Sequence, residues 1–138
     1  MNTDGHGLKH GDLTDRILKA FYEVYGELGY GFLESVYESS MHLVLTGAGI
    51  QVERQRPITV RFRGQVVGEY AADLLVERLV IVELKAARTL DPAHEAQVLN
   101  YLRATPIEVG LLLNFGPQPQ IKRFTFDNAR KSPARPGL

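Results

Sequence analysis

The 138-residue sequence contains no cysteine. Disulfide frameworks, zinc–thiolate sites, iron–sulfur clusters and cysteine nucleophiles are therefore excluded. Long apolar runs are missing as well, since segments such as 79–82 and 111–113 fall far short of a membrane span. Residues 1–13 contain no apolar stretch of signal-peptide length. These absences predict a soluble, cytoplasmic protein.

The sequence also has no net charge, because 16 Lys and Arg residues balance 16 Asp and Glu residues. This balance argues against a protein that coats nucleic acid by bulk charge. The charges are nevertheless unevenly distributed: residues 1–45 are mostly acidic, whereas 51–63 and 122–138 are mostly basic. The basic segments are candidate contacts for phosphate groups, and solvated strand edges with a loose tail are the alternative. The four arginines of the first basic segment are Arg54, Arg56, Arg61 and Arg63.

Hydrophobic residues make up 44% of the sequence and charged residues 23%, which is typical of a globular domain. Residues 1–11 have three glycines and no periodicity, so we expect a disordered lead-in. Residues 128–138 are expected to form a disordered tail. The interval 12–127 is then a single domain, long enough to bury a core without disulfides or metals.

Two helices are expected first. Ile17, Phe21 and Val24 share one face of a helix that begins near 12–14, with Asp12 or Thr14 as its cap. A second helix is expected over 32–46, and the glycines that follow it would end it. The expected core residues of this second helix are Leu33, Val36, Ser40, Leu43 and Val44.

Strands follow. Apolar residues alternate over 58–62, Gly64 marks a turn, and 66–76 returns as a second strand with an irregularity near Gly68. The segment 79–85 begins apolar on both faces, which predicts a central strand. Asp91-Pro92 predicts a helix start, and two more strands are expected over 108–114 and 121–126. The order ααβββαββ predicts an α/β fold with a mixed sheet flanked by helices.

Charged residues interrupt these apolar strands. Glu83 and Lys85 are two residues apart on the central strand and so share a face, and Asp73 interrupts the preceding strand. If the two strands pair, Asp73 lies beside Glu83. Two buried carboxylates repel each other, and a divalent cation such as Mg²⁺ removes the conflict. Lys85 would then lie beside a water on that metal. A buried ion pair between Lys85 and one of the carboxylates is the alternative.

Two helix faces carry further polar groups. His94, Gln97 and Tyr101 share one face of the third helix, and Glu34 shares a face of the second helix with Tyr37. The alternatives are an ordinary polar interface for the first group and a favourable helix-terminus charge for Glu34.

Gly31-x-x-Glu34-x-x-Tyr37 resembles the signature of the bacterial GxxExxY family, which belongs to the PD-(D/E)XK nuclease superfamily. The resemblance spans roughly residues 13–126. Two positions depart from it: Tyr25 stands where family members usually have histidine, and Ala72 precedes Asp73 where the superfamily name has proline. The other matching segments are the context of Asp73, Val82–Lys85, His94–Gln97 with Tyr101, and Gly110–Phe115.

The resemblance implies a restriction-endonuclease-like core. It implies that Asp73 and Glu83 bind Mg²⁺ or Mn²⁺, that Glu34 completes the site, and that the Leu84 carbonyl is a further ligand. Lys85 would be the catalytic lysine. Gln97 and Tyr101 resemble the Gln-x-x-x-Tyr motif of lambda exonuclease-like enzymes. The expected nucleic-acid contacts are Arg54, Arg56, Arg61, Arg63, Tyr37 and His94.

The predicted function is metal-dependent hydrolysis of phosphodiester bonds in nucleic acid, with DNA as the expected substrate. A second hypothesis is a non-catalytic nucleic-acid-binding or interaction module that keeps the nuclease fold. A third is an enzyme that acts on another phosphate ester through the same residues. No membrane partner is expected, and a homodimer and a larger complex both stay open.

Overall fold

Five strands form one mixed sheet in the computed structural model, which describes residues 8–131. The strands lie in chain order, β1-β2-β3-β4-β5, and only the β3–β4 pair is parallel within the described chain. The predicted order ααβββαββ and the central place of β3 are confirmed. The strands are β1 (Val52–Phe62), β2 (Gln65–Val76), β3 (Val80–Lys85), β4 (Val109–Phe115) and β5 (Pro119–Thr125).

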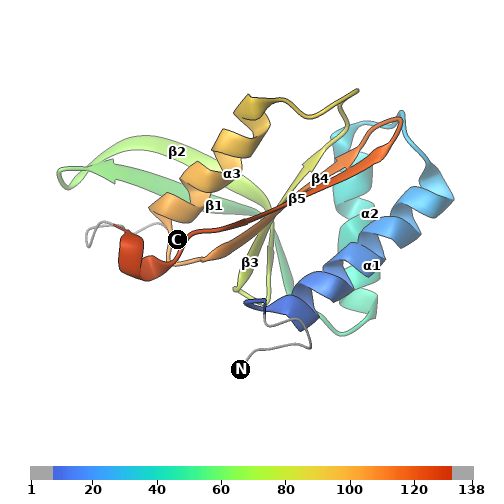
Figure 1. Cartoon of the computed structure of the whole chain (residues 1–138), viewed down its shortest axis with the longest axis horizontal. Coiled ribbons are helices and arrows are strands. Elements are labelled where there is room, and N and C mark those ends of the chain that lie inside the picture. Colours follow the sequence, from blue (N-terminus) through green and yellow to red (C-terminus); the bar gives the residue numbers. More distant parts are fainter. Residues whose placement is uncertain (1–7, 132–138) are drawn as a thin grey trace.

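Helices cover both faces of this sheet (Figure 1). Helices α1 (Gly11–Leu28) and α2 (Glu34–Gly47) pack on one face, and α3 (Pro92–Ala104) packs on the other. Val80, Val82 and Leu84 belong to the core beneath α1 and α2, whereas Ile81 belongs to the core beneath α3. Because side chains alternate along a strand, Glu83 and Lys85 lie on the α3 side.

The start of α1 differs from the prediction. Its N-cap is His10, with φ 55°, and no side chain caps the helix there. Thr14 is buried in the first turn, where its hydroxyl accepts a hydrogen bond from Arg123 Nη1 at 3.1 Å. Arg123 Nη2 also donates to the Lys9 carbonyl at 2.6 Å. A contact with β5 therefore fixes the helix start, and the expected lead-in is ordered from residue 8, while 1–7 lie outside the described residues.

The core face of α2 differs from the prediction, although Val44 does pack, partly buried, against the core. The buried residues are Tyr37, Met41 and Leu45, whereas Leu33 and Leu43 are 76% and 71% exposed. The Tyr37 ring stacks on Phe115 with 4.1 Å between ring centroids. Its hydroxyl donates to the Gly29 carbonyl at 2.7 Å. An aromatic ring with a satisfied polar tip anchors this helix, and Leu33 and Leu43 are left exposed.

The β1–β2 hairpin extends well beyond the rest of the sheet. Only the end of β2, Leu74–Val76, pairs with β3, so the outer part of the hairpin projects alongside α3 (Figure 1). Its register shifts between Val60 and Arg61, which face Gly68 and Val66. The irregularity predicted near Gly68 is thus confirmed, as a bulge of the kind that bends a hairpin.

The second half of the chain follows the prediction closely. Asp91 caps α3 with its side chain, which accepts from the Ala93 N–H at 2.8 Å, and Pro92 opens the helix. Residues 128–130 form a short 3-10 helix, and Lys131 Nζ donates to the carbonyls of Thr105 and Ile107. Ordered structure thus continues past the expected boundary at 127, and 132–138 lie outside the described residues. No helix within 8–131 is both long and apolar enough to cross a membrane.

Candidate active site

Strands β2 and β3 hold two carboxylates side by side. Backbone pairing between the strands runs as far as Leu74 and Val82, and the next residues are Asp73 and Glu83. Asp73 Oδ2 accepts a hydrogen bond from the Leu84 N–H at 2.8 Å, and Glu83 Oε1 accepts one from the Asp73 N–H at 2.9 Å. Each carboxylate therefore fixes the backbone of the opposite strand, and the structure brings the two predicted residues together.

Burial makes this pair electrostatically costly. Glu83 is 3% exposed, and burial, reinforced by the charge of Asp73, raises its pKa to about 8. Burial also raises the pKa of Asp73, against the opposing effects of the Leu84 N–H and the Gln55 amide. Two neighbouring acids, one buried and one half-buried, favour a shared proton or a nearby cation. Their oxygen atoms are the donors that a hard divalent ion prefers, so the residues present fit Mg²⁺ or Mn²⁺.

A third carboxylate approaches the pair from α2. Gln55 Nε2 lies 2.5 Å from Glu38 Oε1 and 3.2 Å from Asp73 Oδ1, so one amide bridges the two acids. Gln55 has φ 50°, a left-handed conformation that non-glycine residues seldom adopt inside a strand. The charge of Glu38 acts to raise the pKa of Asp73. Glu34 is one turn earlier, exposed in the first turn of α2.

Neither Glu38 nor Gln55 was among the predicted site residues. Glu38 follows Glu34 by four residues, so the helix period alone offered it as a candidate. The position of Gln55 opposite Asp73 depends on the β1–β2 register, which the sequence does not specify. Within residues 8–131, no group of three or more His, Asp or Glu side chains has the geometry of a metal site. A pair is sufficient for Mg²⁺, which commonly binds one or two carboxylates and keeps several waters.

Lys85 ends β3 on the same face as the carboxylates. Its charge acts to lower the pKa of both Asp73 and Glu83, so it lies within electrostatic reach of them. The opposite residue on β4 is Asn114, which is fully buried. Asn114 Oδ1 accepts from the Ala87 N–H at 2.9 Å, and its Nδ2 donates to the Ala87 carbonyl at 3.0 Å. A Cβ added at Gly116 would lie 2.4 Å from that carbonyl. The segment after Lys85 is therefore clamped against β4.

Replacing Asn114 with alanine is expected to lower the free energy of unfolding by about 2–4 kcal/mol, because the partly buried backbone of Ala87 loses two hydrogen bonds to a fully buried side chain. Chemical denaturation of the two proteins measures the difference. Asn100→Ala is the control, since Asn100 is an exposed residue of α3. Equal stability of Asn114→Ala and wild type would show that the clamp contributes nothing.

Helix α3 places Tyr101 within electrostatic reach of the carboxylates, and Gln97 one turn earlier hydrogen-bonds to Tyr101. Burial, and then the charges of Glu83 and Asp73, raise the pKa of Tyr101 to about 12, while a hydrogen bond with Gln97 opposes the shift. His94 lies at the start of α3, where its Nδ1 accepts from the Asp91 N–H at 3.3 Å as part of the helix cap. The structure therefore joins Tyr101 and Gln97 to the site and gives His94 a capping contact.

The other expected nucleic-acid contacts are dispersed. Tyr37 is 0% exposed, so its ring does not reach the surface. Arg54 Nε pairs with Glu38 at 3.0 Å, and Arg56 Nη1 pairs with Glu53 at 3.0 Å. Arg63 lies over the Phe62 ring at the hairpin turn. Arg61 lines a cavity between the hairpin and α3.

The site has one carboxylate on each of two adjacent strands and a lysine two residues after the second carboxylate. It lies on a mixed sheet between helices. These features are those of a nuclease fold. The chain belongs to the PD-(D/E)XK nuclease superfamily, whose sequence model matches residues 11–124. The finer assignment to the GxxExxY family stays a prediction.

A comparison of structures agrees on the fold. The crystal structure of SSO0001 is similar to this chain, with a TM-score of 0.55 and 16% sequence identity. The similarity covers 86% of this chain and 60% of the SSO0001 chain, so this chain spans less than two thirds of that protein's length. No curated protein matches the sequence.

Proposed function

We propose that this protein is a metal-dependent nuclease that hydrolyses phosphodiester bonds, with DNA as its substrate. The observation that carries the proposal is the pair of half-buried Asp73 and buried Glu83, each of which accepts a hydrogen bond from the opposite strand, with Lys85 on the same face. A structural role for such a group is costly, since buried charges lose several kcal/mol of hydration each.

Asp73 and Glu83 would hold Mg²⁺ or Mn²⁺, with the Leu84 carbonyl as a further oxygen ligand. A divalent ion supplies, when bound, the positive charge that polarises a phosphoryl oxygen and lowers the pKa of a water. Glu38 supports Asp73 through Gln55. It thereby takes the role that the sequence resemblance assigns to Glu34.

The remaining groups act on the phosphate and the attacking water. The Lys85 ammonium positions the water and stabilises the negative charge that develops on the phosphoryl oxygens. Gln97 and Tyr101 orient Lys85 or a phosphate oxygen from α3. The clamp between Asn114 and Ala87 keeps the end of β3 in place while this happens.

The test is cleavage of labelled single- and double-stranded DNA and RNA with Mn²⁺, with Mg²⁺ and with a chelator. Cleavage that needs the metal and is lost in Lys85→Ala supports the nuclease. Cleavage of a mononucleotide ester but of no polymer would favour the hypothesis of another phosphate-ester enzyme. Folded protein that neither cuts nor binds Mn²⁺ would favour the non-catalytic module.

The structure and the sequence resemblance point to different glutamates of α2 as the residue that supports the metal site: Glu38 and Glu34, respectively. Glu38→Ala is expected to weaken Mn²⁺ binding by about 10- to 100-fold, because it removes the acceptor that holds Gln55 against Asp73, and residues that orient a ligand contribute that much to affinity. Glu34→Ala is the matched control and is expected to bind as wild type. Calorimetric titration measures both. A larger loss in Glu34→Ala would assign the supporting role to Glu34.

A further inference from the structure

A cavity of about 610 Å³ lies between the outer part of the β1–β2 hairpin and α3. Its volume is typical of sites for small organic ligands, which range from about 300 to 1,000 Å³. Tyr101 and Gln97 line it, so it adjoins the carboxylate site on the same face of the sheet. The roles proposed above use only that end of the cavity and leave its remaining walls unexplained.

Small side chains create this space. The residues of α3 that face it recur at helical spacing, and three of them are alanines, so the helix does not pack closely on the hairpin. Gly68 contributes on the hairpin side, because a Cβ there would lie 2.8 Å from the Tyr70 ring. The missing side chain lets that ring lie across the strand. The alanines are Ala93, Ala96 and Ala104.

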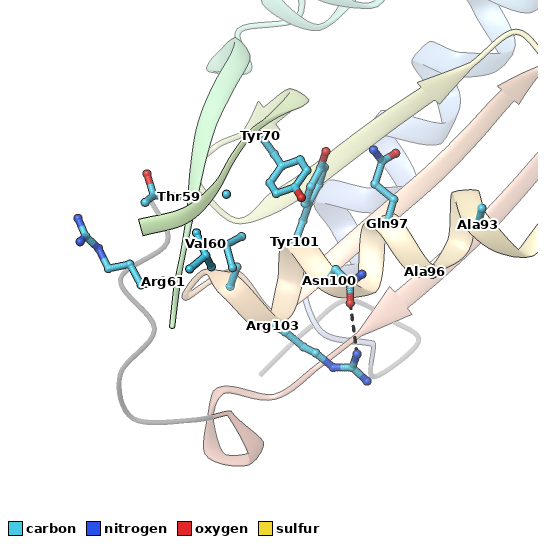
Figure 2. Close-up of a pocket in the computed structure, with 13 residues that line it drawn as sticks. Thr59, Val60, Arg61, Tyr70, Ala93, Ala96, Gln97, Asn100, Tyr101 and Arg103 are labelled. Atoms are coloured by element: carbon cyan, nitrogen blue, oxygen red, sulfur yellow. Dashed lines mark hydrogen bonds between the residues drawn. The ribbon is translucent and has the colours of Figure 1, made fainter. Parts of the chain in front are cut away.

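The walls offer the groups that recognise an unpaired base. Tyr70 is 53% exposed, and its ring lies beside that of the buried Tyr101, with 6.0 Å between centroids (Figure 2). An exposed tyrosine face beside a cavity is a platform on which bases stack. Gln97 and Asn100 stand one turn apart on α3, and each amide presents both donors and an acceptor. A base edge presents the same two kinds of group.

The charged residues that line the cavity are all positive. Its lining residues include two arginines, Arg61 and Arg103, and no acidic residue. Both arginines extend away from Tyr70, one from the hairpin and one from the end of α3 (Figure 2). Arg103 also donates to Asn100 Oδ1 at 3.3 Å. The cavity thus has aromatic and amide groups in its interior and cations at its rim. This arrangement matches a ligand whose aromatic part enters the cavity while its phosphates stay at the entrance.

We infer that this cavity holds an unpaired base of the nucleic-acid substrate, stacked on Tyr70, with the adjoining phosphates against Arg61 and Arg103. The inference rests on the proposed function, which it narrows to substrates that have a single-stranded segment. A fully paired duplex keeps its bases stacked inside the helix and has none to insert.

Direct binding tests the inference without requiring catalysis. The probes are an end-labelled oligothymidylate and a blunt, fully paired hairpin duplex, in low salt with a chelator, followed by fluorescence anisotropy. The single strand is expected to bind more tightly than the duplex. Tyr70→Ala is expected to weaken single-strand binding by about 5- to 100-fold, the range for losing one stacked base.

Matched variants separate stacking from folding. Tyr70→Phe keeps the ring and is expected to bind as wild type. Tyr22→Ala removes an equally exposed tyrosine from α1 and is expected to have no effect. Ala96→Leu fills the cavity from an exposed helix position and is expected to weaken binding as Tyr70→Ala does. Wild-type binding by both Tyr70→Ala and Ala96→Leu overturns the inference, as does wild-type protein that binds no single strand.

Failure of the inference is distinguishable from failure of the proposed function. Metal-dependent cleavage of a single strand at the wild-type rate by Tyr70→Ala and Ala96→Leu would overturn the inference and leave the nuclease intact. Binding that depends on Tyr70, in a protein that cuts nothing with either metal, would support the cavity and overturn the proposed catalysis.

Discussion

Replacing Lys85 with alanine is expected to reduce metal-dependent cleavage by at least about 100-fold while the protein stays folded. The loss is that large because a preorganised cation at the developing charge stabilises the transition state more than the ground state. Lys85 is half-buried at the end of β3, beside the two carboxylates. It lies two residues before Ala87, whose backbone is hydrogen-bonded to Asn114. Single-turnover cleavage of a labelled strand, with the melting temperature of each protein, measures both parts of the expectation.

The controls test the geometry as well as the charge. Lys122→Ala removes a lysine from β5, whose Nζ lies 4.0 Å from Glu95, and is expected to cut at the wild-type rate. Lys85→Arg keeps the positive charge on a larger, planar group and is expected to recover only a small part of the activity. Asp73→Asn is expected to lose cleavage as fully as Lys85→Ala.

The same variant decides between the nuclease site and a structural ion pair. Removing one member of a buried structural pair leaves the other charge uncompensated and costs about 3–5 kcal/mol. If Lys85→Ala unfolds at room temperature, or if it retains cleavage, the proposed role of Lys85 is wrong. Full activity of Asp73→Asn would reject the metal site itself.

Local patterns predicted the parts of the fold that local physics controls. Asp91-Pro92 predicted the start of α3, because the cap and the proline act within one turn. The apolar run before Glu83 predicted a strand covered on both faces, and β3 is the middle strand of the sheet. Pairing of β2 with β3 then brought Asp73 beside Glu83, so the two carboxylates were predictable once the strands were placed.

The errors fall where a distant residue decides the local structure. Arg123 of β5 contacts the start of α1, so neither Asp12 nor Thr14 serves as its cap. Phe115 of β4 receives the Tyr37 ring, which turns a different face of α2 to the core than its aliphatic residues suggest. Glu34 and Glu38 share a face of α2, and the position of β1 along that helix places Gln55 against Glu38 rather than one turn earlier at Glu34.

Glu83→Gln is expected to stabilise the metal-free protein increasingly as pH rises from about 5 to about 8. The pKa of Glu83 is about 8 in the folded state, against an ordinary value of 4.5. The folded protein therefore holds a proton that the unfolded chain has released, and stability falls as pH rises through this interval. The full shift corresponds to at most about 5 kcal/mol, at about 1.4 kcal/mol per pH unit. Glutamine keeps the acceptor for the Asp73 N–H and removes the titration.

Urea denaturation at several pH values measures this difference, with Glu95→Gln as the control, because Glu95 is a partly exposed glutamate of α3. Mn²⁺ is expected to stabilise the wild type most at the high end of the interval, where both carboxylates are charged, and to have little effect on Glu83→Gln. Wild-type stability that stays level or rises between pH 5 and 8 would mean that Lys85 already neutralises Glu83. In that case the buried charges would form a structural ion pair, and the electrostatic argument for a cation at this site would fail.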